Sequence, residues 1–322
     1  DGSAHLTMDQ IKASLDGFIE QEGVGAVVQF SGGEPTVHPN IVGAVKEAVS
    51  RPIEVVMINT NGIKIAQDED LVKRLVDVSE NKLEISLQFD GFTDDVNQKI
   101  RGAKMAGLKM KAIENMLKHG LPVNLAAVIQ RGVNEDQIGK IVEFGIKTKG
   151  IRGVNFQPAF FAGRYEHDFN PMDRVTNTEI MDRLEEQTSG MFRKTDFLPL
   201  PCSHPSEIAM TYAYIRGKKV KPIPRFINME PYMDQFTNTI FTDPRPIYKK
   251  AIEGLWSASS SFSSMKTLYD FSCVCGIPMK KDFFTEKGRQ KIADENAFRI
   301  ILIQFQDKYN WDMKGVKKCC IG

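Results

Sequence analysis

The chain has 322 residues, of which 42% are hydrophobic and 26% charged, and 42 Lys and Arg balance 41 Asp and Glu to a formal net charge of +1. This composition is that of a globular protein and excludes a disordered tail, a collagen-like repeat and a disulfide-dense miniprotein. The near-neutral charge, without long basic runs, argues against nucleic-acid binding, which depends on neutralising phosphates. No apolar run reaches the roughly 18 residues that span a bilayer, and residues 1–5 lack the basic and apolar regions of a secretory signal.

The first half of the sequence alternates between two hydrophobic patterns. Apolar residues three and four apart, such as Ile11, Leu15 and Phe18, predict amphipathic helices, and short apolar runs between them predict buried strands. In chain order, the expected helices lie over residues 9–22, from about 40 to 49, 71–76, 110–120 and 138–146, and the expected strands over residues 26–30, 54–58, 83–89, 123–129 and 154–157. The strands begin roughly 28 to 40 residues apart, which is the length of a βαβ unit and predicts a parallel sheet with right-handed crossovers.

A parallel sheet needs helices on its exposed faces, which leaves an open doubly wound sheet or a (β/α) barrel. Polar residues lie at the carboxyl ends of the expected strands: Ser31, Asn59, Gln88, Asp90, Gln130, Arg131, Asn155 and Gln157. A barrel directs such strand ends into one shared cavity. We therefore expect an α/β fold built on a partial (β/α) barrel.

The character of the sequence changes after about residue 163. Prolines recur from Pro171 to Pro278, a density that interrupts regular alternation, and all five cysteines lie in this half. One clear helix is expected over residues 178–187 and one strand over residues 299–304. We expect two domains: a barrel over residues 1–162, and a loop-rich, cysteine-containing module over residues 163–322.

The sharpest local signal is Ser31-Gly32-Gly33-Glu34-Pro35, directly after a buried strand and before a helix. Two glycines let the backbone turn tightly and approach a ligand closely. Glu34 then offers a carboxylate at the end of the sheet, suited to an ammonium group. The loop is not a phosphate-binding loop, because no Gly-Lys-Ser/Thr follows it. The alternative is an ordinary strand-to-helix turn with an exposed glutamate.

Gly32-Gly33-Glu34-Pro35 resembles the motif with which the radical S-adenosylmethionine (SAM) superfamily binds the methionyl amino group, and Thr60-Asn61-Gly62 and Gln88-Phe89-Asp90 fit the layout of that superfamily. The resemblance implies SAM as a cofactor. It also implies that Asp90 or Gln88 faces the ribose hydroxyls and that Asn155 or Gln157 lies near the adenine. The implied cofactor-binding residues are Gly32, Gly33, Glu34, Pro35, Thr60, Asn61, Gln88, Asp90, Asn155 and Gln157.

The sequence departs from this superfamily in one respect. The reductive [4Fe–4S] cluster of the superfamily is held by a Cys-x3-Cys-x2-Cys loop after the first strand, and the first cysteine here is Cys202. The first expected element is also a helix. We expect the first strand and its loop to lie upstream of Asp1, and the present chain to be inactive by itself. A member of the superfamily without radical chemistry is the alternative.

A closer resemblance extends over nearly the whole sequence. The chain is similar to the tetraether lipid synthase group, itself similar to radical SAM methylases of a hydroxymethyl-dihydropterin, in the stretches 28–36, 87–92, 152–158, 171–174, 201–205, 255–258 and 318–320. The resemblance implies an enzyme that generates a 5′-deoxyadenosyl radical and joins isoprenoid lipid tails by a C–C bond. It further implies an electron donor such as a ferredoxin, and a cytoplasmic enzyme that contacts a membrane surface peripherally. Methyl transfer to a pterin is the alternative, and a non-catalytic barrel with structural zinc that acts as a binding protein is the alternative from another class.

The cysteines are the candidate metal ligands, and they are Cys202, Cys273, Cys275, Cys319 and Cys320. Cys273 and Cys275 are close enough to reach two irons of one cluster, and Cys202 with Cys319 or Cys320 would complete four ligands. In the tetraether lipid synthase group the C-terminal cysteines hold an auxiliary [4Fe–4S] cluster. A structural zinc ion and buried unligated thiols are the alternatives.

The sequence does not decide the roles of two further groups of residues. A structural role is favoured for His38 and His204 over a role in binding. Arg164, Asp173 and Arg174 follow the last barrel strand and would either meet a polar headgroup or cofactor carboxylate, or form a salt-bridged surface turn.

Overall fold

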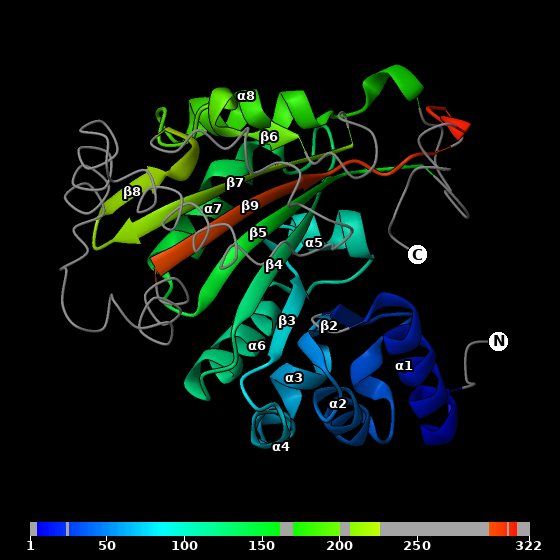
Figure 1. The fold of residues 1–322 in the computed structure, drawn as a ribbon. Helices are drawn as coiled ribbons and strands as arrows, with labels where there is room; N and C mark the ends of the chain where they lie inside the picture. Colours follow the sequence, from blue (N-terminus) through cyan, green and yellow to red (C-terminus); the bar gives the residue numbers. More distant parts are fainter. Residues whose placement is uncertain are drawn as a thin grey trace, which may run out of the picture. The chain divides into compact units, whose positions relative to one another are not determined.

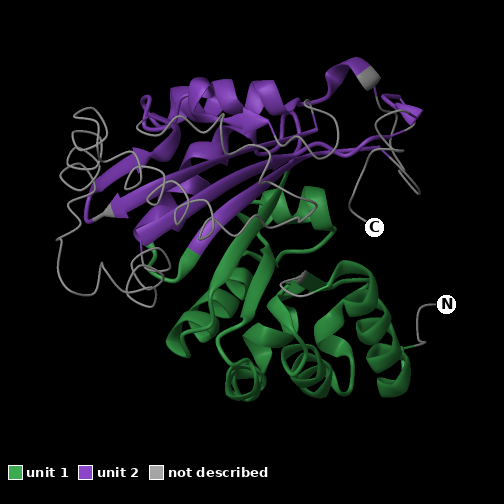
Figure 2. Cartoon of the chain, in the orientation of Figure 1, with its two compact units in different colours: residues 1–128, 148–151 green, residues 129–147, 152–322 purple. Residues whose placement is uncertain are grey.

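We describe a computed structural model of the chain over residues 5–23, 26–161, 170–199, 207–225, 296–307 and 309–313. The chain divides into two compact units (Figure 2). Unit 1 consists of residues 1–128 and 148–151, and unit 2 of residues 129–147 and 152–322. The domain boundary predicted between residues 162 and 163 stays a prediction.

Unit 1 is a parallel sheet covered by helices (Figure 1). The strands β1 (Ala26–Phe30), β2 (Ile53–Thr60), β3 (Leu83–Gln88) and β4 (Val123–Ile129) pair in parallel in this order. The helices are α1 (Met8–Glu22), α2 (Ile41–Val49), α3 (Ile63–Gln67), α4 (Glu69–Val78), α5 (Asp94–Arg101) and α6 (Ala106–Lys118), with a 3₁₀ turn at Pro35–Val37. Helix α1 packs on α2, α2 on α4 and β2, and α3 on α6.

The helix boundaries follow from local capping chemistry. Helix α1 begins with a capping box in which Thr7 accepts a hydrogen bond from the amide of Gln10, and the Gln10 side chain accepts one from the amide of Thr7. Helices α4 and α5 have simpler N-caps: a side-chain oxygen of Asp68 accepts from the Leu71 amide, and that of Thr93 accepts from the Val96 amide. These caps satisfy amide groups that the first helical turn leaves without a partner.

The two faces of the unit 1 sheet differ in chemistry. The strand register aligns Ile58, Ile85 and Val123, all 0% exposed, in an apolar row across three strands. The next row on the opposite face aligns Asn59, Ser86 and Asn124. Because side chains alternate along a strand, Gln88 lies on this polar face as well.

Unit 2 contains α7 (Ile138–Lys147), β5 (Ile151–Pro158), α8 (Asn177–Gln187), β6 (Leu198–Pro199), β7 (Ile208–Arg216), β8 (Lys219–Pro222) and β9 (Ala297–Ile303), with 3₁₀ turns at Glu135–Gln137, Pro171–Asp173, Lys194–Asp196 and Ile223–Arg225. Strand β9 is parallel to β5, and β7 is antiparallel to β9. Strands β6 and β8 pair antiparallel with β7. Gly153 allows the close approach of β5 and β9, because a Cβ there would lie 2.5 Å from the carbonyl oxygen of Arg299.

The predicted α/β class with a parallel sheet is confirmed, and the strands that the structure describes do not close into a ring. Every helix and strand expected in the first half is present. Helices α3 and α5 and strands β6, β7 and β8 are not predicted from the sequence. Strand β7 was missed because the surrounding prolines masked an apolar run, and α3 because five residues carry little periodicity. None of the described helices is long and apolar enough to cross a membrane.

Gly62 gives the first test of this packing. Its φ is +80°, and an added Cβ would lie 2.5 Å from Leu87 Cδ1 and 3.2 Å from Ala112 Cβ. We expect Gly62→Ala to lower the free energy of unfolding by about 3 kcal/mol or more, because backbone strain and overpacking add. Gly120→Ala is the matched control, since Gly120 has φ of +73° and no heavy atom within 4 Å of the built Cβ. It should cost only about 1 to 2 kcal/mol. Equal losses in urea-induced unfolding would contradict the close packing around Gly62.

Candidate functional site

The Glu34 carboxylate joins two loops at the carboxyl ends of β1 and β2. Its Oε1 accepts hydrogen bonds from the Thr36 amide at 3.1 Å, the Thr36 hydroxyl at 2.5 Å and the Thr60 hydroxyl at 2.6 Å. Its Oε2 accepts one from the Asn61 amide at 2.7 Å. Thr36 and Thr60 are 2% and 0% exposed. The predicted alternative of an ordinary turn with an exposed glutamate is wrong, because Glu34 is half-buried and tied to its neighbours.

The segment 60–62 that meets Glu34 is held by several hydrogen bonds. The Thr60 hydroxyl accepts from the Gly62 amide at 3.0 Å while it donates to Glu34. Asn61 Oδ1 accepts from the Ile63 amide at 2.9 Å, at the start of α3. The main-chain oxygen of Asn61 accepts from Lys109 Nζ at 2.6 Å. The site is thus organised before any ligand binds.

The two carboxylate oxygens of Glu34 differ in how many further hydrogen bonds they can accept. A carboxylate offers about four lone-pair sites, two on each oxygen. Among the described residues, Oε1 already accepts three hydrogen bonds and Oε2 accepts one. Oε2 therefore retains a place for one further N–H donor, and its negative charge favours an ammonium group.

Asp90 is buried in an ion pair. Its carboxylate is 0% exposed and accepts from Arg101 Nε at 2.7 Å, from Arg101 at a second nitrogen at 2.9 Å, and from the Val128 amide at 2.8 Å. This bidentate pair holds α5 to the end of β3 and the adjacent strand β4. Gln88 lies two residues earlier and is half-buried. The prediction that Asp90 or Gln88 faces ribose hydroxyls stays a prediction, and the pairing of Asp90 favours Gln88.

Lys109 is a residue of this site that the sequence analysis did not identify. Burial lowers the pKa of Lys109 to about 8. The negative charges of Asp90 and Glu34 act in the opposite direction, and the positive charge of Arg101 lowers the pKa further. A signal was present in the sequence, because Lys109 lies in helical register with Ala112, Ile113 and Met116 on the buried stripe of α6. A lysine on such a stripe calls for a buried partner.

Asn155 and Gln157 lie on β5, in unit 2. Asn155 is 5% exposed, and its Oδ1 has no hydrogen-bond partner among the described residues. Gln157 is half-buried. Both side chains belong to the polar carboxyl-terminal half of a strand, as expected, and their predicted place near an adenine stays a prediction.

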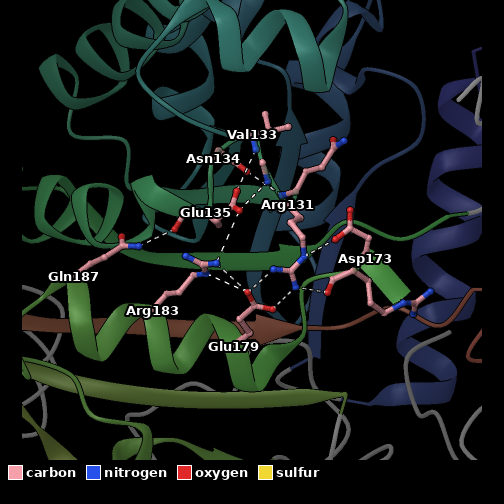
Figure 3. Close-up of polar contacts among 11 residues, drawn as sticks. Arg131, Val133, Asn134, Glu135, Asp173, Glu179, Arg183 and Gln187 are labelled. Carbon is pink, nitrogen blue, oxygen red and sulfur yellow. Dashed lines mark hydrogen bonds and ion pairs between the residues drawn. The ribbon is translucent and has the colours of Figure 1, made fainter. Parts of the chain in front are cut away.

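Figure 3 shows an ion-pair network of unit 2 around Arg131, which follows β4. Arg131 donates to both oxygens of Glu179 at 2.9 and 2.6 Å and lies 3.2 Å from Asp173 Oδ1. Arg183, one turn further along α8, also donates to Glu179 at 3.1 Å. Burial works to raise the pKa of Glu179, but Arg131 and Arg183 outweigh it and hold that pKa below its ordinary value. The network anchors the start of α8 to the loop after β4.

A second ion pair of unit 2 is almost fully buried. Arg174 donates to both oxygens of Asp307 at 3.0 and 2.9 Å, and the Phe161 amide donates to Oδ2 at 3.0 Å. Burial works to raise the pKa of Asp307, and the amides of Phe161 and Tyr309 together with Arg174 hold it low. Asp173 and Arg174 are therefore both ion-paired, but only the exposed Asp173 fits the predicted salt-bridged surface turn, because the partner of Arg174 is fully buried. Arg164 lies outside the described residues.

The predicted metal ligands lie outside the described residues. None of Cys202, Cys273, Cys275, Cys319 and Cys320 is described, and neither is His204. Within the described part of the chain, no three His, Cys, Asp or Glu side chains gather as a metal site. His38 has the structural role expected of it, because its Nε2 meets the carbonyl oxygen of Leu6 at 2.9 Å and its Nδ1 accepts from the Asn40 amide at 3.1 Å.

Residues 1–145 match the sequence profile of the Radical SAM superfamily, and this span contains Glu34, Asn61, Asp90 and Lys109. They form a radical SAM domain. The match confirms the resemblance at the level of the superfamily, together with SAM and a [4Fe–4S] cluster as the cofactors of that domain. The carboxylate at the end of β1 fits the amino group of SAM, whereas the ligands of the reductive cluster are not found before Cys202.

Curated relatives extend the likeness beyond this domain. The chain is 27% identical to the 7,8-dihydro-6-hydroxymethylpterin dimethyltransferase of Methanocaldococcus jannaschii, over 98% of this chain and 67% of the relative. It is 31% identical to the probable GTP 3′,8-cyclase of Thermococcus kodakarensis, over 53% of this chain and 56% of the relative. The chain thus spans between about half and two thirds of the length of these relatives. Both relatives are enzymes by name, and together with the Radical SAM match they support an enzymatic function.

Among solved structures, Streptococcus suis SuiB bound to S-adenosylmethionine aligns with 59% of this chain and 41% of its own, at 17% identity and a TM-score of 0.42. A likeness this low carries no argument about the reaction.

The buried ion pair of unit 1 can be tested directly. We expect Arg101→Met to lower the free energy of unfolding by about 3 kcal/mol, because it removes the bidentate guanidinium partner of the fully buried Asp90. Asp70→Asn is the control, since Asp70 and Lys73 form a solvent-exposed pair, 78% and 50% exposed, which should contribute little to stability. Urea-induced unfolding measures both. A loss at Arg101 no larger than that at Asp70 would show that the carboxylate of Asp90 is hydrated.

Proposed function

We propose that unit 1 binds SAM with its methionyl ammonium on Glu34 Oε2. The supporting observation is the unequal loading of the two carboxylate oxygens, which leaves Oε2 able to accept one more N–H. Gly32 and Gly33 carry no side chain, and a Cβ built at either would meet no atom within 4 Å, so a ligand can approach the main chain there. Thr36, Thr60 and Asn61 then hold the carboxylate in place.

The cofactor supplies the difficult chemistry, and the protein supplies binding and orientation. SAM and a reduced [4Fe–4S] cluster, when bound, would supply the radical chemistry that removes a hydrogen atom from carbon. Glu34 fixes the amino end of SAM, and we assign Gln88 to the ribose. An auxiliary cluster on the late cysteines and an external electron donor such as a ferredoxin belong to the same proposal.

We further propose that the whole enzyme joins isoprenoid lipid tails by a C–C bond. The resemblance to tetraether lipid synthases in the second half of the sequence supports this reaction. Unit 2 also presents large apolar side chains beyond the ends of β5 and β9. Phe160 and Phe305 are 47% and 41% exposed, with ring centroids 5.2 Å apart, and Trp311 is 57% exposed. Exposed apolar side chains of this size suit an apolar substrate or the surface of a membrane.

Methylation of a pterin is the second candidate function. It is supported by the 27% identity to the pterin dimethyltransferase over nearly the entire chain. The polar row Asn59, Ser86 and Asn124 on one face of the unit 1 sheet is also compatible with a polar heterocycle. The two reactions differ in their substrates and in their products, so they can be distinguished by direct assay.

The proposed SAM site predicts the effect of Glu34→Gln in the full-length enzyme, purified without oxygen. We expect SAM to bind about tenfold more weakly or worse, because the variant loses the charge and places an amide N–H against one of the four donors. Equilibrium dialysis with SAM measures the change. Glu114→Gln is the matched control, since Glu114 forms an exposed pair with Lys111 and should leave SAM affinity unchanged. Unaltered affinity in Glu34→Gln would remove the proposed role of Glu34.

The reaction itself is tested with the full-length enzyme, a chemical reductant and each substrate class in turn. Joining two C–H carbons releases two hydrogen atoms, so we expect two molecules of 5′-deoxyadenosine for each C–C bond formed between lipid tails. Mass spectrometry of the lipids and chromatography of the nucleoside measure this ratio. A methylated pterin, with no coupled lipid, would overturn the lipid proposal in favour of the second candidate.

A further inference from the structure

Lys109 is one of the most deeply buried charged groups of unit 1. It lies on α6 at 1% exposure, beside Ala112 and Ile113 of the same buried stripe. Burying a lysine is costly unless its ammonium is paired or hydrogen-bonded. A buried lysine therefore calls for a specific partner.

That partner is the main chain of segment 60–62, which also meets Glu34. Lys109 Nζ donates to the main-chain oxygen of Asn61 at 2.6 Å. The main-chain amide of Asn61 donates to Glu34 Oε2 at 2.7 Å. Asn61 is thus held on one side by a buried cation and on the other by the carboxylate proposed to bind the ligand. Nearby on α6, Asn115 donates to the main-chain oxygens of Ile65 and Ala66 at 2.9 and 3.3 Å, so the helix fixes α3 as well.

The charges around Lys109 come from three other segments. Glu34 lies in the loop after β1, Asp90 follows β3, and Arg101 lies on α5. Glu34 and Asp90 favour the charged ammonium, whereas Arg101 and burial disfavour it. With Lys109 protonated, two cations balance two anions. The ammonium therefore offsets one negative charge while it holds Asn61.

We infer that Lys109 is a positioning residue for SAM, acting through Asn61 on Glu34. By fixing the Asn61 main chain, it directs the Asn61 amide at Oε2 and keeps the remaining acceptor site of that oxygen aimed at the ligand ammonium. Lys109 itself need not contact SAM. This inference rests on the proposed function of Glu34.

The test is Lys109→Met in the full-length enzyme, purified without oxygen. Methionine matches the length and apolar stem of lysine but lacks the ammonium. We expect KM for SAM and its dissociation constant to rise about tenfold, with kcat at saturating SAM changed less than about twofold. A purely structural role would instead lower stability and kcat together. Unchanged KM and dissociation constant in a folded variant would overturn the inference.

Lys82→Met is the matched control. Lys82 Nζ donates to the main-chain oxygen of Val49 at 2.9 Å, which is the same kind of bond in the same unit but directly before β3, at the opposite end of the sheet from Glu34. We expect it to leave SAM affinity unchanged. An equal loss in Lys82→Met would show that any lysine-to-carbonyl bond of the unit acts through general stability, and would overturn the specific role of Lys109.

The pH dependence of unfolding tests the burial on which the inference depends. The pKa of Lys109 falls to about 8 in the folded state. Below that pH, Lys109 is protonated in both the folded and the unfolded chain, so the full free-energy cost of burying its charge lowers the stability of the fold. Above it the unfolded chain binds more protons, so the wild type should gain stability relative to Lys109→Met as pH rises from about 8 towards about 10.4. A difference that does not change with pH would show that Lys109 is solvated and would overturn the inference.

The Glu34→Gln variant separates this inference from the proposed function. If Glu34→Gln binds SAM normally, the proposed SAM site fails. If Glu34→Gln weakens binding while folded Lys109→Met does not, the proposed site stands and only the positioning role of Lys109 fails.

Discussion

The carboxylate of Glu34 is the constraint on which the candidate site depends. One side chain accepts four hydrogen bonds from two loops that follow different strands, so the glycine loop after β1 and the segment 60–62 after β2 cannot move independently. Hydrogen bonds to a charged acceptor are roughly twice as strong as neutral ones. The resulting rigidity organises the candidate site, and Oε2 keeps one position for a further donor.

Buried charge surrounds this carboxylate. Asp90 is completely enclosed and depends on Arg101, and Lys109 is nearly enclosed and depends on the main chain of Asn61. An apolar cluster of similar volume would contribute as much to stability, because desolvation offsets most of the attraction in a buried ion pair. The buried charges instead provide a defined geometry, because each hydrogen-bonds to one specific partner. Such groups concentrate where a protein must hold a geometry.

The second unit differs in what its charges do. The ion pairs of Arg131 with Glu179 and of Arg174 with Asp307 attach the start of α8 and the segment after β5 to strand ends. They anchor a surface that carries Phe160, Phe305 and Trp311 in partial exposure. The proposed SAM site lies within residues 1–145, which match the Radical SAM superfamily. Fold and superfamily alone do not determine which substrate is used.

The sequence by itself determined the α/β class, the alternation of helices and strands through residue 158, and the glycine–glutamate loop as the site of interest. These features are local, because hydrophobic periodicity and short motifs are written in neighbouring residues. The tertiary structure decided the rest. Asn61 lies 27 residues from Glu34, Lys109 lies 48 residues from Asn61, and Arg101 lies 11 residues beyond Asp90. No local pattern specifies such pairs, since they exist only once parallel strands bring their carboxyl ends to one edge and α6 packs on α3. Strand β7 likewise becomes evident only in its pairing with β9, whose residues lie far along the chain.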